Sequence, residues 1–301
     1  MAVARPKTID VLMCTFRRPQ VIETIASLNA QVLPPHLKLR VIVADNDDYP
    51  SAEERVRSAA IAAPVDVRYI HAPARNISIA RNACLDAADA DWVAFIDDDE
   101  HAAEDWLMRL YTSLSETGTD AVFGPALAIY PDAAPDWMKQ QDHHSNVPVR
   151  RGAHVTTGHT CNALLRWRDT PWAQERFELA RGRSGGEDTE FFFRLRRKGA
   201  QFEVAEDAVV FEPTDPTRLS FAWLRRRKFR MGQSYAASAE GLAARMKLGL
   251  SAAAKMGFCF TMSLIYVFDS GQWRFWALRG FMHAGVVAGC ASLSEAVLYA
   301  D

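Results

Sequence analysis

The sequence has few cysteines, and none are paired at metal-binding spacing. Its five cysteines are far apart and odd in number, and no Cys-x-x-Cys pair occurs. This argues against a zinc site or a disulfide framework and fits the reducing cytosol. The first residues contain no apolar segment, so we expect no signal peptide there. The chain also lacks internal repeats and low-complexity segments.

The chain also has few long apolar runs and a net charge close to zero. The nearest approach to a membrane span is 248–268, which Lys255 interrupts and which is marginal in length and hydropathy. The net charge is only −2, but residues 218–301 carry 11 basic and 4 acidic residues, against 24 and 33 in residues 1–217. A basic, apolar C-terminal part predicts an anionic partner or a membrane surface. The acidic remainder argues against nucleic acid as a partner.

Strand and helix patterns alternate through the first half of the chain. The hydrophobic content of 49% and the charged content of 24% are typical of a globular protein. Strands are expected at 9–15, 39–45, 67–70 and 92–96, and helices at 19–30, 51–63, 78–88 and 104–117. This alternation predicts a mostly parallel sheet. Beyond it we expect a strand at 121–129, a long loop at 130–160 and helices from about residue 221.

The most informative segment is the acidic run at 97–99, directly after an apolar strand. Residues 92–96 predict a fully buried strand, whereas a row of carboxylates cannot enter a core unless it is paired or binds metal. The carboxylates therefore belong at the C-terminal edge of the sheet, where open α/β sheets bind ligands. Clustered oxygens there suit Mg²⁺ or Mn²⁺ shared with substrate phosphates. A solvated acidic turn is the alternative.

Further motifs follow in a specific order. The first strand ends in Thr15-Phe16-Arg17 and the second in Asp45-Asn46, and Gly185-Gly186-Glu187-Asp188 comes after the acidic run. With the segment at 74–82, this order resembles the inverting family 2 glycosyltransferases of the GT-A fold. Among them it is most similar to bacterial enzymes of succinoglycan and exopolysaccharide biosynthesis. The resemblance covers residues 7–235.

The resemblance implies a site for a nucleotide-sugar donor. It assigns donor binding to Thr15, Phe16, Arg17, Asp45, Asn46, Asn76, Arg81, Asp97 and Asp98. A carboxylate such as Asp45 can accept hydrogen bonds from a uracil N–H or from ribose hydroxyls. Asp99, together with Asp97, is expected to bind the divalent metal, which neutralises charge on the departing diphosphate.

A second pair of acids points to the acceptor side. Glu187 and Asp188 follow two glycines and start a predicted helix, whose dipole favours negative charge. By resemblance, Asp188 is the general base and Glu187 contacts an acceptor hydroxyl. Gly158 and Asn162 are expected to line the acceptor pocket. Acids in a first helical turn are also common for stability alone, which is the structural alternative.

A basic aromatic helix is expected at 221–234. Its Arg226, Arg227 and Arg230 can grip a diphosphate from the donor or from a lipid-linked acceptor, or they can form a solvated basic face. The segment at 246–290 is rich in Met, Phe, Trp and Leu. It predicts amphipathic helices in a membrane interface or a hairpin packed on protein.

The sequence thus predicts an α/β protein of GT-A type, with a Rossmann-like sheet flanked by helices and a helical C-terminal extension. We expect a catalytic domain at 1–217, with nucleotide binding in 1–100 and acceptor binding in 101–217, followed by a helical region at 218–301. The expected function is metal-dependent, inverting transfer from a nucleotide-diphosphate sugar, with a UDP-sugar favoured, to a saccharide hydroxyl. The acceptor is expected to be lipid-linked, in exopolysaccharide or cell-surface polysaccharide biosynthesis, with the protein peripheral at the cytoplasmic face of the membrane. The alternatives are a nucleotidyltransferase and a catalytically degenerate sugar-nucleotide-binding or scaffold protein.

Overall fold

The computed structural model describes residues 7–150, 155 and 157–291. The chain divides into two compact units. The first unit is built from the chain up to residue 128, from 145–182 and from 191–212. The second unit is built from 129–144, from 183–190 and from the chain after residue 212.

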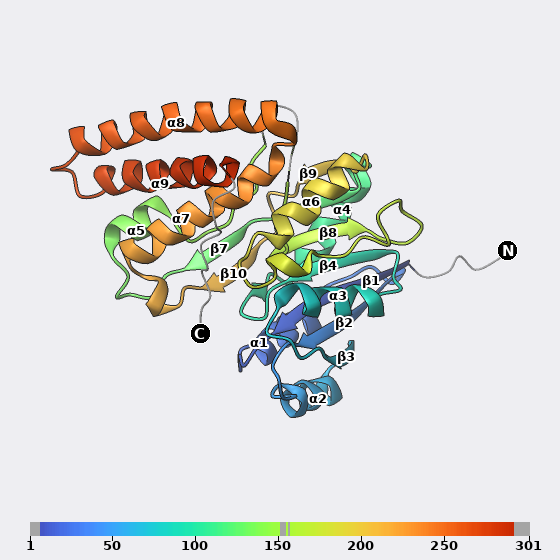
Figure 1. Cartoon of the computed structure of the whole chain (residues 1–301). Helices are drawn as coiled ribbons and strands as arrows, with labels where there is room; N and C mark the ends of the chain where they lie inside the picture. The colour runs from blue at the N-terminus through green and yellow to red at the C-terminus, as the bar shows by residue number, and fades with distance from the viewer. Residues whose placement is uncertain (1–6, 151–154, 156, 292–301) are drawn as a thin grey trace. The chain divides into compact units, whose positions relative to one another are not determined.

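The first unit contains a seven-stranded sheet with the strand order β3-β2-β1-β4-β8-β6-β9 (Figure 1). The strands are β1 (Lys7–Thr15), β2 (Leu37–Asp45), β3 (Asp66–His71), β4 (Trp92–Ile96), β6 (Ala121–Phe123), β8 (Asn162–Arg166) and β9 (Phe202–Val204). All neighbours pair in parallel except β8, which is antiparallel to both β4 and β6. The mostly parallel sheet predicted from the sequence is confirmed.

Helices pack on both faces of this sheet. They are α1 (Val21–Asn29), α2 (Glu53–Ala62), α3 (Ile77–Ala87), α4 (Trp106–Thr117) and α6 (Glu187–Arg197). Val11 and Val41 share one buried cluster with α1 and α4, while Leu12 and Ile42 share another with α3 and α6. Successive strand residues thus serve opposite faces, as expected for a sheet covered on both sides. The first four of these helices lie within two residues of their predicted bounds.

A smaller sheet contains β5 (His101–Ala102), β10 (Val210–Pro213) and β7 (Ala126–Ile129). The single strand predicted at 121–129 is therefore wrong, because the chain leaves the large sheet after Phe123 and enters the small one. The break falls at Gly124 and Pro125. A Cβ on Gly124 would lie 2.1 Å from the Ala208 carbonyl oxygen. Pro125 has no N–H to donate to a strand ladder.

The loop predicted at 130–160 contains a helix that the sequence analysis missed, α5 (Asp136–Gln141). Elsewhere in the described part of the chain there are three short 3₁₀ helices, η1 (Leu179–Arg181), η2 (Pro216–Arg218) and η3 (Ala236–Ser238). Residues 151–154 and 156 of the predicted loop lie outside the described residues.

The second unit is mainly helical, which confirms the predicted C-terminal extension. Its long helices are α7 (Phe221–Tyr235), α8 (Gly241–Ile265) and α9 (Gln272–Cys290). Helix α9 packs against both α7 and α8 and runs between them (Figure 1). Glycines permit this close approach. A Cβ on Gly285 would lie 1.9 Å from the Phe229 carbonyl oxygen of α7, and one on Gly280 would lie 2.7 Å from the Phe260 ring of α8.

Candidate active site

Three parallel strands of the first unit end at one edge of the sheet. In the β1–β2 ladder Thr15 pairs with Asp45, the last residues of both strands. Strand β4 lies on the other side of β1, also parallel, and leads directly into Asp97. The structure therefore brings the ends of β1, β2 and β4 to the same edge, as the sequence predicts. This is the edge at which open α/β sheets bind ligands.

The acidic run after β4 forms a tight turn. The Asp97 amide donates a 2.8 Å hydrogen bond to Glu100 Oε2, and Thr24 Oγ1 donates to the Asp98 carbonyl at 3.0 Å. Glu100 is fully buried, and this burial raises its pKa well above the usual range. Glu100 thus holds the turn together.

Arg18 is the counterion of this turn. It forms ion pairs with Asp98, at 3.1 Å, and with Asp99. Burial raises the pKa of Asp98 to about 7 although Arg18 acts in the opposite direction. The neighbouring Arg17, which the sequence analysis favoured, instead pairs with Asp47 at 2.8 Å and lowers the pKa of that carboxyl to about 2.

Asp45 is part of the framework of this edge. Its side chain is fully buried and accepts hydrogen bonds from the Asp47 and Ala52 amides, at 3.1 and 2.8 Å, and from the Tyr69 hydroxyl at 3.0 Å. A carboxylate so enclosed shapes the turn after β2. Asp45 therefore has a framework role, and the donor contact predicted for it stays a prediction.

The side chains of Asn46 and Asn76 also form hydrogen bonds within the protein. Asn46 Oδ1 accepts from the Asn76 amide at 2.6 Å, and its Nδ2 donates to the Ala72 carbonyl. Asn76 Oδ1 accepts from the Ser78 and Ile79 amides as the N-cap of α3. Both residues thus fix the edge and the start of α3, and the donor contacts predicted for them stay predictions.

Arg81 reaches the acidic run from α3. Its side chain is largely buried, with Nη2 3.8 Å from Asp97 Oδ1 and the guanidinium 5.5 Å from the centre of the Phe177 ring. Phe16 stays 36% exposed and lies against the Arg17 guanidinium, 5.0 Å from its ring centre. Arg81 therefore lies beside the acidic run, as the sequence predicts, and its contact with a nucleotide remains a prediction.

Asn162 and Gly158, predicted to line an acceptor pocket, are packed in the core of the first unit. Asn162 is 1% exposed, and its Oδ1 accepts from Trp106 Nε1 at 2.8 Å. Its Nδ2 donates to the Pro125 and Ala208 carbonyls at 2.9 and 2.7 Å. A Cβ on Gly158 would lie 1.9 Å from the Phe123 ring. Packing explains both residues, and the acceptor contacts predicted for them stay predictions.

An Asn162→Ala variant is expected to be less stable by about 2–4 kcal/mol, because it leaves Trp106 Nε1 and the Ala208 carbonyl without the partner that Asn162 gives them. Thermal unfolding followed by circular dichroism measures this loss. Asn162→Asp keeps the shape and the acceptor for Trp106 but faces two carbonyl oxygens with a carboxylate, so it should lose at least as much. If Asn162→Ala were as stable as the wild type and had a raised KM for the acceptor, the result would support the acceptor contact predicted for Asn162.

The second pair of acids lies in the second unit. Glu187 and Asp188 occupy the first turn of α6, and Asp188 Oδ1 accepts from the Thr189 amide at 2.6 Å. Gly185 and Gly186 precede them with φ angles of 85° and 82°, in the left-handed region that favours glycine. The double glycine therefore lets the chain turn directly into the acidic helix start.

Helix α7 holds this turn in place. Arg230 is 2% exposed and donates from Nε to the Ser184 carbonyl at 2.6 Å, from Nη2 to Ser184 Oγ at 3.2 Å, and from Nη2 to the Gly185 carbonyl. One turn further along α7, Ser234 Oγ would lie 2.2 Å from a Cβ on Gly186. Arg230 is thus a brace for the segment before Glu187. The diphosphate contact predicted for it stays a prediction.

Arg226 and Arg227 remain accessible on α7. Arg226 is exposed, and Arg227 is half-buried with its guanidinium 5.3 Å from the centre of the Trp223 ring. Their contact with a diphosphate stays a prediction.

Arg18, Ser184 and Ser234 were given no role from the sequence, although Ser234 ends the basic aromatic segment at 221–234. A signal existed for Ser234, because it lies four residues after Arg230 and hence on the same face of α7. Arg18 directly follows the motif Thr15-Phe16-Arg17, but the pattern alone does not say which of two adjacent arginines turns to the acidic run. No local pattern marks Ser184.

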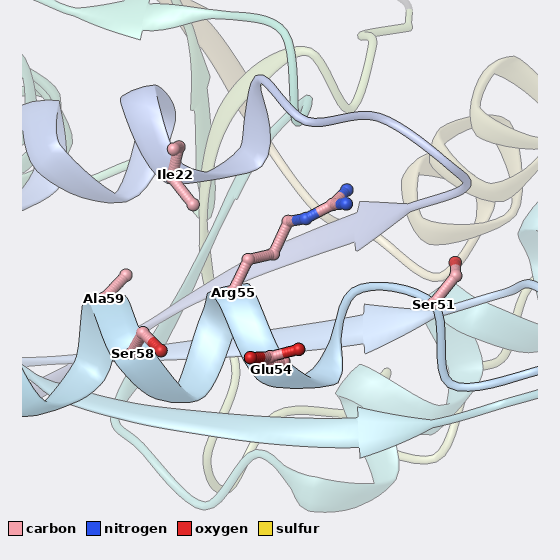
Figure 2. A pocket seen from close by; sticks show the side chains of 6 residues that line it. All are labelled: Ile22, Ser51, Glu54, Arg55, Ser58 and Ala59. Carbon is pink, nitrogen blue, oxygen red and sulfur yellow. The ribbon is translucent and has the colours of Figure 1, made fainter.

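A shallow groove of about 420 Å³ lies between α1 and the start of α2 (Figure 2). It is lined by Ile22, Ser51, Glu54, Arg55, Ser58 and Ala59. None of the residues predicted for the site lines it, so we assign it no role.

The carboxylates of the acidic turn fit a divalent cation that arrives with a diphosphate. Within the part of the chain that the structure describes, no group of three or more His, Cys, Asp or Glu side chains is placed to hold a metal alone. The side chains of Asp97 and Asp99 are 46% and 20% exposed. Mg²⁺ and related cations are commonly held by one or two carboxylates, with phosphates and water completing the shell.

A mostly parallel sheet covered by helices on both faces, with carboxylates at its strand ends, is an α/β architecture that fits the GT-A type. The structure is similar to the mannosyltransferase PcManGT from Pyrobaculum calidifontis, solved with GDP-Man and Mn²⁺. The match has a TM-score of 0.63 and 18% identity, and it covers 95% of this chain and 87% of that one. Residues 1–349 of S. aureus TarS match with a TM-score of 0.53 and 13% identity, over 93% and 90%. These likenesses confirm the GT-A fold.

The chain belongs to glycosyl transferase family 2, whose sequence profile matches residues 10–168. It is also 44% identical over 295 residues to "Succinoglycan biosynthesis protein ExoM" of Rhizobium meliloti (strain 1021), covering 97% of this chain and 95% of that protein. The resemblance inferred from the sequence motifs is confirmed. The protein is therefore a glycosyltransferase, and the nucleotidyltransferase alternative is set aside.

Proposed function

We propose that this protein transfers a sugar, with inversion, from a nucleotide-diphosphate sugar to a saccharide hydroxyl in exopolysaccharide biosynthesis. The observation that carries the proposal is the 44% identity, over 97% of the chain, to a protein named for succinoglycan biosynthesis. A UDP-sugar is the favoured donor. The GDP-Man of the mannosyltransferase structure does not decide the base, because that protein is only 18% identical.

The residues divide the chemistry between them. Asp188 removes the proton of the acceptor hydroxyl as it attacks the anomeric carbon, and this single displacement inverts the configuration. Arg81 and Phe16, at the strand edge, contact the donor. Asp97 and Asp99 would hold Mg²⁺ or Mn²⁺, which neutralises charge on the leaving diphosphate. Arg226 would bind phosphate of a lipid-linked acceptor.

The same proposal places the protein peripherally at the cytoplasmic face of the membrane. A lipid-linked acceptor is confined to the bilayer, and residues 218–301 are basic and apolar. Basic segments are attracted to the anionic lipids of that leaflet.

Titration calorimetry with UDP, GDP and dTDP, each with and without Mn²⁺, tests the proposal. We expect one nucleotide to bind, at least about tenfold more tightly with Mn²⁺ than without, which is about 1.4 kcal/mol. Mn²⁺ alone should bind weakly, because the metal needs phosphate oxygens to complete its shell.

Asp99→Asn is the matched variant for this titration. It should remove most of the Mn²⁺ dependence while the metal-free affinity for the nucleotide changes little. If the folded wild-type protein binds none of the three nucleotides, the proposal is wrong and the degenerate scaffold becomes the better interpretation.

A further inference from the structure

The outer face of α8 is apolar and exposed. Its stretch of highest mean hydropathy, 1.5, is only 11% buried, so α8 is not a core helix. Large exposed side chains recur along it, at Leu242, Met246, Leu250, Phe258 and Leu264, and the run ends in Phe268, which is 99% exposed. The spacing of mostly three or four residues, or multiples of these, places them on one stripe of the helix. We call this stripe, with residues 264–268, the α8 surface.

The charge of the α8–α9 segment is predominantly basic. Residues 241–290 contain five basic side chains, Arg245, Lys247, Lys255, Arg274 and Arg279, and a single acid, Asp269. The three on α8 are exposed. Lys and Arg chains can lie along apolar surface while their charged ends stay in water, at the level of lipid head groups.

The opposite face of α8 is occupied by protein. Ala252 and Cys259 are buried on this face, and α9 packs along α8 (Figure 1). Twenty-five residues give a helix of about 37 Å, long enough to cross a bilayer. A spanning helix, however, would carry Lys255 and the packed α9 into the hydrocarbon. An orientation in the plane of the interface wets the basic groups and buries only the α8 surface.

A second copy of the chain is a poorer occupant. A two-fold interface brings the same patch of both copies together, so the basic side chains of this patch would face their equivalents. Like charges juxtaposed across an interface disfavour binding. A lipid surface with negative head groups instead complements both the stripe and its charge.

We propose that the α8 surface lies in the interfacial layer of an anionic lipid membrane, with residues 264–268 inserted below the head groups. This inference names the surface that would hold the protein at the membrane, as the proposed function requires. It depends on the proposed function only for the reason why the protein should be at a membrane. Lipid binding needs neither nucleotide nor turnover. A failure to bind lipid would therefore not change the result of the nucleotide titrations, and a failure to bind nucleotide would not change the result of the lipid experiment.

Co-sedimentation of the full-length protein with vesicles tests the proposal. We expect strong binding to phosphatidylcholine mixed with phosphatidylglycerol, weak binding to phosphatidylcholine alone, and a decline with added salt. Leu264→Asp combined with Phe268→Asp should reduce binding by about a hundredfold, because two inserted apolar side chains are lost. Lys247→Gln with Lys255→Gln should mainly remove the preference for anionic lipid.

Ile61→Asp is the control, since Ile61 is 89% exposed on α2 and lies in the first unit. It should bind vesicles as the wild type does. Three results would overturn the proposal: no vesicle binding by folded protein, retention of the chain in membranes after alkaline carbonate extraction, or a dimer in solution that Phe268→Asp dissociates. The second indicates a spanning helix and the third a second copy as the occupant.

Discussion

Replacing Asp188 with asparagine is expected to lower kcat by about 10²- to 10⁴-fold, the usual contribution of a general base. Asparagine has nearly the same shape but cannot take a proton from the acceptor hydroxyl. The role proposed for Asp188 involves the acceptor hydroxyl and not the nucleotide, so nucleotide affinity with Mn²⁺ should change by less than about threefold. Turnover with a synthetic acceptor and calorimetry with the nucleotide measure the two quantities on the same preparation.

Glu190→Gln is the matched control for this experiment. Glu190 lies in the same first turn of α6, so its replacement removes one negative charge from the same helix terminus. Helix-dipole stabilisation alone is worth about 0.3–1 kcal/mol, and both variants would lose it equally. A large fall in kcat confined to Asp188→Asn therefore identifies the base. Turnover near the wild-type rate in Asp188→Asn would assign the acids of this turn to stability instead.

The fold was predictable where local patterns decide it. Apolar strands ending in polar residues, separated by helices with capping and turn signals, predict both the parallel sheet and the edge at which its carboxylates lie. The pattern failed at 121–129, because the apolar run continues through Gly124 and Pro125 while the chain changes sheets. That change depends on the close approach of Ala208, more than eighty residues away in sequence, which no local signal encodes.

The motifs of the site were predictable, but the burial and the hydrogen-bond partners of individual side chains were not. Asp45, Asn162 and Arg230 all belong to the motifs that the sequence singles out, yet each is buried by partners remote in the chain. Tyr69 donates a hydrogen bond to Asp45, and Trp106 donates one to Asn162. A sequence pattern reports that a polar residue is needed at a position. Whether it serves a ligand or the framework is decided by tertiary neighbours.

Arg230 shows the consequence of this distinction for an experiment. Arg230→Met removes a buried guanidinium from the Ser184 and Gly185 carbonyls, and bonds to charged groups contribute about 1.5–3 kcal/mol each. We expect a fall in Tm of about 5 °C or more. We also expect kcat to fall by about tenfold or more, because the segment before Glu187 loses its brace. Differential scanning calorimetry and steady-state kinetics measure the two effects.

The lysine variant separates a brace from a phosphate ligand. Lysine keeps the charge but lacks the planar fork that reaches two carbonyls at once, so Arg230→Lys should recover little of either loss. Arg225→Met, an exposed change on the same helix, should leave Tm and kcat unchanged. Under the brace interpretation nucleotide affinity stays constant in all three variants. If Arg230→Lys restored turnover, or if Arg230→Met weakened nucleotide binding without lowering Tm, the side chain would act on phosphate, as the sequence alone suggested.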